Sequence, residues 1–254
     1  MSTLAIAKSP SPLRGRIVRH LLASLDQVAA IEDPFSHCFW EGVFPDDIYE
    51  QLLDNLPNPA VHYPCSMKRH KNDQGQSTRD WFELNDVFFA RLPDDLRQFW
   101  GDVQLALCDD ALQRKLFDVL QQDLAARFGL RDPAQAREIP ARAEPRLCRD
   151  LDTYEIAPHP DGRQKLVTMQ IYLPRDRSQI ELGTALYRRR FPTLRGLTSW
   201  QGRFRKVKQF PFLPNSAYAF VVSNGLWKKS WHGREAIPAG SGVRNSLFNT
   251  FYVV

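Results

Sequence analysis

The sequence predicts an α+β protein with a helical N-terminal half and an antiparallel β-sheet C-terminal half. Apolar residues recur at helical spacing up to residue 128, and from residue 146 onward the period becomes alternating. Turns rich in glycine and proline also divide the second half at regular intervals. Many short strands separated by such turns indicate a sandwich or a jelly roll.

Helices are predicted in the first half from apolar spacing and from residues typical of helix ends. Pro45 and the two acids after it begin one helix, which Pro57 ends. The clearest helix ends before Gly129, a residue typical of helix C-termini. This helix has one apolar stripe, which would pack against a sheet. The predicted helical segments are 15–30, 46–56, 82–92, 94–101 and 106–128, and 131–145 is predicted as a linker.

Strands are predicted where apolar and polar residues alternate between turn signals. The predicted strands are 146–156, 166–173, 183–188, 203–209, 217–223, 229–233 and 244–253.

The length of 254 residues allows one large domain. We predict a basic tail and short helix over 1–30, and a single domain over 31–254. Within this domain, 31–145 supplies mainly helical support and 146–254 forms the β core. The polar segment 61–80 is a loop, and it is either a lid over a site or a solvated loop.

Composition excludes several classes of protein. The net charge of +5, from 34 Lys and Arg against 29 Asp and Glu, is too small for a nucleic-acid-binding signature. No run approaches the roughly 18 to 20 apolar residues of a membrane span. The four cysteines form no CxxC pair and fit a reducing compartment better than a disulfide framework.

We therefore expect a cytoplasmic protein and leave its oligomeric state open. Residues 1–25 are basic, contain serines and lack acids, so an organelle presequence leading to a matrix location is the alternative.

Two histidines and an aspartate have the spacing of a metal site. His159 and Asp161 are separated by one residue, so on a strand both side chains point to the same face. His232 lies in an alternating segment and could add a second imidazole from another strand. Two imidazoles and one carboxylate leave three positions of a metal open, as in non-haem Fe(II) oxygenases. Taken alone, His159 is equally well a turn histidine and His232 a core histidine.

Arg244 and Ser246 share one face of a predicted strand by alternation, and that face could point into the barrel. A guanidinium that points into a barrel is a costly buried charge unless an anion meets it. A dicarboxylic acid whose far end reaches Arg244 and Ser246, and whose near end chelates the metal, satisfies both sites. The alternative is a salt bridge on an edge strand.

At these residues the chain resembles the Fe(II)/2-oxoglutarate-dependent oxygenase superfamily, and in particular its prolyl-4-hydroxylase-like branch. The resemblance covers residues 146–254 and rests on six pieces in matching order and spacing. These are Tyr154-x4-His159-x-Asp161, the strand 166–173, the segment 183–187, the segment 212–220, Trp231-His232-Gly233 and Arg244-Asn245-Ser246. The animal prolyl hydroxylases have lysine where this chain has Arg244, which argues against their peptide substrate.

The resemblance implies a double-stranded β-helix, or jelly roll, in the C-terminal half, supported by helices from the N-terminal half. It also implies Fe(II) bound by His159, Asp161 and His232, which would be the catalytic residues.

The resemblance further implies a co-substrate, 2-oxoglutarate, that chelates the iron and lies with its 5-carboxylate against Arg244. Ser246, with Tyr154 or Tyr172, would add hydroxyl donors. With O2 as the oxidant and ascorbate as a candidate reductant, the default reaction is hydroxylation of a substrate C–H with release of succinate and CO2. Desaturation and ring closure stay open.

Substrate contacts are less well indicated. Arg149, Gln170 and Trp227 are candidates, with ordinary packing or exposure as the alternative. Basic residues concentrated over 188–208 and at 228–229 indicate either an anionic small-molecule substrate or a solvated basic face.

Three functions follow from these observations. The first is a dioxygenase that hydroxylates a small metabolite or a sugar-like biosynthetic intermediate. The second is a prolyl-type hydroxylase of a protein side chain. The third is a non-catalytic jelly-roll module that binds or senses 2-oxoglutarate.

Overall fold

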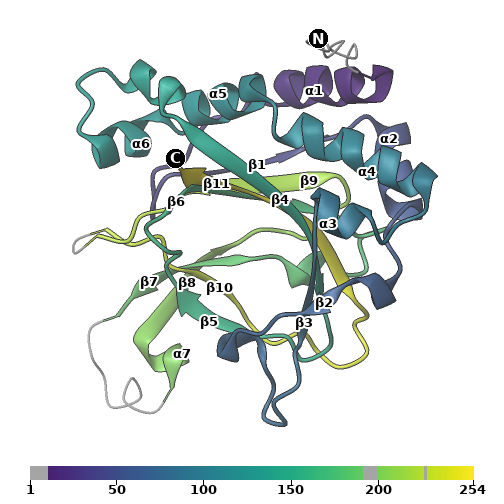
Figure 1. Ribbon diagram of the computed structural model, residues 1–254. Helices are drawn as coiled ribbons and strands as arrows, with labels where there is room; N and C mark the ends of the chain where they lie inside the picture. Colours follow the sequence, from purple (N-terminus) through teal and green to yellow (C-terminus); the bar gives the residue numbers. More distant parts are fainter. Residues whose placement is uncertain (1–10, 191–198, 226–227) are drawn as a thin grey trace.

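A layer of helices lies over two antiparallel β-sheets in the computed structural model, which describes residues 11–190, 199–225 and 228–254 (Figure 1). The larger sheet has the strand order β1-β9-β6-β11-β4-β3-β2, and the smaller sheet has the order β5-β10-β7-β8. The fold is a double-stranded β-helix in the C-terminal half with helical support from the N-terminal half, which confirms the predicted fold class.

The strands are β1 His37–Glu41, β2 Tyr63–Pro64, β3 Arg79–Glu83, β4 Ala141–Asp150, β5 Ile156–His159, β6 Lys165–Tyr172, β7 Ala185–Arg189, β8 Phe204–Gln209, β9 Ser216–Val221, β10 His232–Arg234 and β11 Arg244–Val253. The α-helices are α1 Pro12–Ser24, α2 Asp46–Asp54, α3 Asp86–Phe89, α4 Asp94–Leu107, α5 Asp110–Val119, α6 Gln121–Phe128 and α7 Trp200–Arg203. Short 3-10 turns lie at Pro59–Val61, Lys68–His70, Pro133–Glu138 and Ile180–Leu182.

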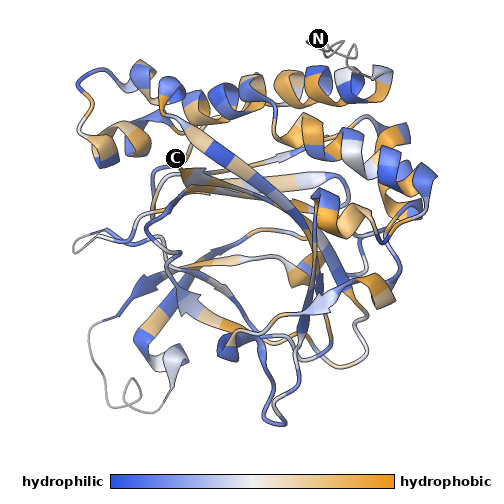
Figure 2. Ribbon diagram, viewed as in Figure 1, coloured by the Kyte–Doolittle hydropathy of each residue, from blue (hydrophilic) through white to orange (hydrophobic). Residues whose placement is uncertain are grey.

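Alternation along the central strands separates the two sides of the larger sheet. Met169, Ile171 and Phe251 belong to the main hydrophobic core, which they share with the helices. Tyr172 and Tyr218 belong to a second apolar cluster with residues of the smaller sheet, which places them between the sheets. In Figure 2 the covering helices carry both hydrophobic and hydrophilic residues, as expected for helices that bury one stripe. The space between the two sheets is therefore where a site can form.

The predicted helix over 106–128 is wrong, because the chain forms three helices there. α4 ends at Leu107, and the side chain of Asp109 accepts a hydrogen bond from the Ala111 amide to begin α5. The apolar spacing continues through these breaks because all three helices bury their stripes in the same core. Apolar period therefore predicted helical structure correctly but not where one helix ends.

Other predicted boundaries also need correction. The predicted linker over 131–145 contains a 3-10 turn and the first residues of β4. The predicted helix over 82–92 contains the last two residues of β3 and then the short α3, which the Asn85 side chain caps. The predicted strand over 146–156 ends at Asp150.

The N-terminal helix packs on the rest of the chain, with Ile17 and Leu21 fully buried in the main core. All four cysteines are free thiols. Within the described residues, no helix has the length and apolar content needed to cross a membrane. The proposed boundary at residue 30, and the presequence, stay predictions, and residues 1–10 lie outside the described part of the chain.

Candidate metal centre

The structure brings together the three residues predicted to bind a metal. His159 is the last residue of β5 and His232 the first of β10, and they are paired directly across the two strands. Their ring centroids are 4.5 Å apart, and Asp161 follows two residues after His159. One potential ligand atom from each of the three residues lies within 4.8 Å of the others.

A glycine allows the two histidine-bearing strands to lie close together. A Cβ atom on Gly233 would lie 2.6 Å from the carbonyl oxygen of Ile156 on β5, which is closer than two such atoms can approach. Any side chain at position 233 would push β10 away from β5, and His232 would move with it.

Both imidazoles are held with one nitrogen free for a metal. The Nδ1 atom of His159 is 3.0 Å from the Ala157 carbonyl oxygen, and that of His232 is 2.9 Å from the Ser230 carbonyl oxygen. A carbonyl oxygen only accepts, so each Nδ1 carries the proton and each Nε2 keeps its lone pair. Burial lowers the pKa of both histidines and outweighs Asp161, which raises it; His232 lowers the pKa of His159 further, and Lys165 lowers that of His232. Both rings are therefore neutral at pH 7.

The carboxylate of Asp161 is buried and oriented by two donors. Lys165 Nζ donates to Oδ1 and Thr168 Oγ1 donates to Oδ2, both at 2.8 Å. Burial raises the pKa of Asp161, but Lys165 and His232 outweigh it and hold the pKa well below its usual range. His232 Nε2 lies 3.9 Å from Asp161 Oδ2. Two neutral imidazoles and an ionised carboxylate fit a divalent cation, and this ligand set is the one that leaves positions open on Fe(II).

The three residues line a cavity of about 330 Å³, and a cluster of guanidinium groups lines the same cavity. Arg244 is 1% exposed and lies on β11, between β6 and β4 in the larger sheet. It therefore points into the barrel as predicted, and the alternative placement on an edge strand is wrong.

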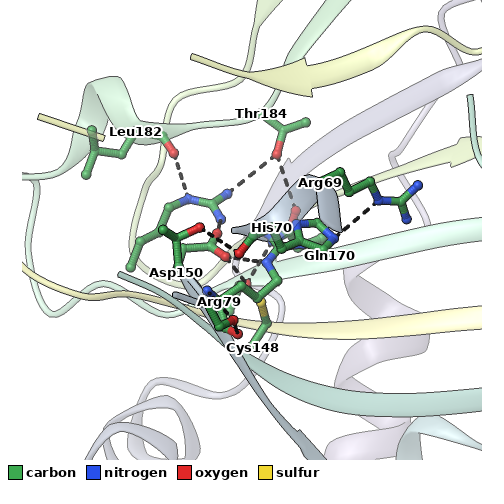
Figure 3. A network of polar contacts seen from close by, with 12 residues as sticks. Arg69, His70, Arg79, Cys148, Asp150, Gln170, Leu182 and Thr184 are labelled. Atoms are coloured by element: carbon green, nitrogen blue, oxygen red, sulfur yellow. Dashed lines mark hydrogen bonds and ion pairs between the residues drawn. The ribbon is translucent and has the colours of Figure 1, made fainter. Parts of the chain in front are cut away.

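Arg244 is nevertheless paired with a carboxylate inside the protein. Its Nη1 donates to Asp150 Oδ2 at 2.6 Å and its Nε to the Leu182 carbonyl oxygen at 2.7 Å. Arg79 Nε donates to the other oxygen of Asp150 at 2.5 Å. Burial raises the pKa of Asp150, but Arg79 and Arg244 outweigh it and lower the pKa. Figure 3 shows this network of polar contacts around Arg79, Asp150, Leu182 and Thr184.

The other predicted co-substrate residues have different surroundings. Tyr154 lines the cavity, and its buried hydroxyl has no hydrogen-bond partner among the described residues. The Ser246 hydroxyl accepts a hydrogen bond from Gln170 Nε2 at 2.7 Å, and the Tyr172 hydroxyl accepts one from the Thr184 amide at 3.0 Å. Ser246 and Tyr172 are thus held behind the cavity wall, whereas Gln170 lines the cavity.

One predicted substrate residue, Arg149, does not line the cavity, and another lies outside the described residues. Arg149 pairs with Asp80 at 3.1 Å and lines a separate hollow with His62 and Asn245, which agrees with the alternative of ordinary packing and not with a substrate contact in this cavity. It lies on β4 between Cys148 and Asp150, and alternation turns it to the opposite face of the sheet. Trp227 lies outside the described residues.

Sequence reasoning missed several residues of this site. Lys165 and Thr168 follow Asp161 by four and seven positions. Arg234 follows His232 by two positions, so alternation could have indicated that both side chains lie on the same face of a strand. Arg79 and Asp150 gave no local signal, because their contact with Arg244 depends on the order of β3, β4 and β11.

No protein-family model matches the chain, and no curated protein matches it. Solved structures do. A prolyl-4-hydroxylase from Pseudomonas putida is 11% identical and covers 94% of this chain and 100% of its own, with a TM-score of 0.49. A prolyl hydroxylase from Trichoplax adhaerens, in complex with a hypoxia inducible factor oxygen degradation domain peptide fragment, is 11% identical, with 94% and 90% coverage and a TM-score of 0.50.

A third similar structure is JOX2 in complex with 2OG, Fe and JA, which is 16% identical, with coverage of 85% of this chain and 68% of its own and a TM-score of 0.50. At these identities the likeness is one of fold. The chain has the double-stranded β-helix fold of the 2-oxoglutarate- and Fe(II)-dependent oxygenases, prolyl hydroxylases among them.

Proposed function

We propose that this protein is an Fe(II)- and 2-oxoglutarate-dependent dioxygenase that hydroxylates a C–H bond of a small molecule. The observation that carries the proposal is the pairing, in one cavity, of a two-histidine, one-carboxylate set with buried guanidinium groups. His159, Asp161 and His232 would hold the iron, and Arg244 would hold the far carboxylate of 2-oxoglutarate.

Bound iron would supply activation of O2, coupled to conversion of 2-oxoglutarate to succinate and CO2 and to oxidation of the substrate. The protein's own residues prepare the site for it. The carbonyl oxygens of Ala157 and Ser230 fix the tautomers of the two histidines. Lys165 and Thr168 keep the Asp161 carboxylate ionised and oriented. Aromatic side chains around the guanidinium groups, Trp81, Tyr154 and Phe248 among them, line the cavity and limit its water.

A small metabolite or a sugar-like intermediate is the substrate class that we favour, since the enclosed volume of about 330 Å³ must hold both the co-substrate and the reacting part of the substrate. Arg69 and Arg146 also line this cavity and favour an anionic group on the substrate. A prolyl-type protein hydroxylase is the second candidate, favoured by the fold shared with a prolyl hydroxylase that was crystallised with a peptide.

Succinate release from 2-oxoglutarate, with Fe(II), O2 and ascorbate, tests the reaction class. We expect slow succinate release without substrate, stimulated by the correct member of a metabolite library or by a proline-containing peptide. The variant His159→Ala should abolish release, and the control His20→Ala, a histidine on α1 away from the cavity, should not. Tight binding of 2-oxoglutarate with no turnover for any candidate would instead indicate a binding or sensing module.

A further inference from the structure

Arg234 is a buried cation without a partner carboxylate. It is 4% exposed, lies at the end of β10 and lines the cavity. Its Nη1 donates to the Gly183 carbonyl oxygen at 3.2 Å, and its buried Nε has no hydrogen-bond partner among the described residues. No carboxylate of the residues that the structure describes forms an ion pair with it. A buried charge in this condition is costly unless a ligand of opposite charge completes the site.

The charges around Arg234 do not balance. Three guanidinium groups, those of Arg79, Arg234 and Arg244, line this part of the cavity. One carboxylate, that of Asp150, faces them, and its two oxygens are taken by Arg79 and Arg244. The carboxylate of Asp161, further along the cavity, is already paired with Lys165. Two positive charges are therefore left in a largely buried cluster.

Arg234 and Arg244 reach the same short segment of chain. Arg244 donates to the carbonyl oxygen of Leu182 and Arg234 to that of Gly183, the next residue. Burial and then repulsion from Arg244 lower the pKa of Arg234 to about 10, so both groups are charged at pH 7. The Nη2 of Arg244 has only a 3.5 Å contact with the Thr184 hydroxyl, seen near the labelled Thr184 in Figure 3. The hydroxyl of Tyr154, also unpartnered, lines the same cavity.

We propose that Arg234 is a second carboxylate-binding residue, and that Arg234 and Arg244 together hold the distal carboxylate of 2-oxoglutarate. This inference rests on the proposed function, because it takes 2-oxoglutarate as the ligand. It assigns Arg244 a divided role, in which Nη1 binds Asp150, Nε binds the Leu182 carbonyl oxygen, and Nη2 is left for the ligand. Two guanidinium groups against one carboxylate suit the charge excess that Asp150 leaves.

Anaerobic calorimetry with Mn(II) in the metal site tests the proposal by binding, without turnover. Two ligands are compared: 2-oxoglutarate, and 2-oxobutyrate, which has the same chelating end but no distal carboxylate. The variant Arg234→Met should lower the affinity for 2-oxoglutarate by about 30-fold or more, and should change the affinity for 2-oxobutyrate by less than about 3-fold. The control Arg114→Met removes an exposed cation from α5, away from this cavity, and should change the affinity for 2-oxoglutarate by less than about 3-fold.

Unchanged 2-oxoglutarate binding by Arg234→Met, with tight binding by the wild type, would overturn the role of Arg234 and leave the proposed function intact. Equal weakening of both ligands would also overturn it, because that result indicates a structural role. If the wild-type protein with Mn(II) bound neither ligand, that result would contradict the proposed function itself, and this inference with it. Should Arg234→Met not fold by circular dichroism, the same comparison with Arg234→Gln, which removes the charge but keeps a polar side chain, decides the question by the same criteria.

Discussion

The two ends of the cavity are prepared for ligands of opposite charge. At the metal end, two neutral imidazoles and one carboxylate keep lone pairs free. At the guanidinium end, three cations lie around the carboxylate of Asp150, which pairs with two of them, Arg79 and Arg244. Under the proposed function, a metal would complete the first end, and a keto-diacid bound to that metal would place an anion at the second. Substitutions at the two ends should therefore have different effects on metal binding, co-substrate binding and stability.

The largest effect is expected from Asp161→Ala at the metal end. The change removes a proposed ligand but little core volume, so the fold should be retained while activity falls by more than about 1,000-fold. Metal affinity, measured by calorimetry with Mn(II), should fall by about 100-fold or more. Asp95→Ala, which removes an exposed carboxylate from the first turn of α4, is the matched control. Unchanged activity would show that the metal lies elsewhere.

Arg244→Met should weaken co-substrate binding at the guanidinium end and leave metal binding intact. We expect the 2-oxoglutarate requirement to rise by about 100-fold, because a buried charge-assisted pair with the ligand is lost. Stability should fall as well, by about 2 to 3 kcal/mol, since Asp150 keeps only Arg79 as a partner. Urea unfolding of the metal-free protein measures this loss, and Mn(II) affinity should change little. If the variant had normal 2-oxoglutarate kinetics, another residue would have to bind the distal carboxylate of 2-oxoglutarate.

His70 tests whether burial beside the cations of the guanidinium end keeps an imidazole unprotonated. Its ring is 2% exposed and stacks on Tyr154, and burial and then Arg79 lower its pKa to about 3. The unfolded chain takes up this proton near pH 6.5 and the folded chain does not, so the contribution of His70 to stability falls as the pH drops from about 6.5 towards 3. His70→Phe keeps a ring for stacking and removes the titration.

The free energy of unfolding of the metal-free wild type should therefore drop between pH 7 and pH 4.5 by about 1 to 2 kcal/mol more than that of His70→Phe. Urea unfolding at the two pH values gives this difference. An equal drop in both proteins would mean that His70 is readily protonated in the folded state.

The two ends also differ in how far the sequence predicts them. The metal end has a short local signal, since His159 and Asp161 are two residues apart and His232 lies in its own alternating segment. In β6, Gln170 and Tyr172 share one face and Met169 and Ile171 share the other, as the alternation of this segment indicates. A period of two is a local property of the chain, so it can be read without knowing the neighbouring strands.

The guanidinium end depends on which strands are neighbours. Asp150 is paired with Arg79 on β3 and with Arg244 on β11, and 94 positions separate Asp150 from Arg244. Strand order of this kind is decided by the packing of the whole sheet, so the carboxylate partner of Arg244 could not be predicted. The same limit applies to the helix breaks at Asp109 and Leu120, where capping and tertiary packing outweigh a continuous apolar period.

The smallest effect is expected from Arg149→Gln. This substitution tests whether an arginine that is close to the site in sequence, but outside the cavity, affects co-substrate binding. Arg149 is adjacent to Asp150 in sequence, but it faces away from the cavity and pairs with Asp80 near the surface, where both side chains are partly exposed. We expect a loss of less than about 1 kcal/mol in the free energy of unfolding, and the same 2-oxoglutarate requirement as the wild type. Succinate release at varied 2-oxoglutarate, beside Arg244→Met, measures the contrast. A raised requirement in Arg149→Gln would mean that charge alone, and not the face of the sheet, decides which arginines serve the co-substrate.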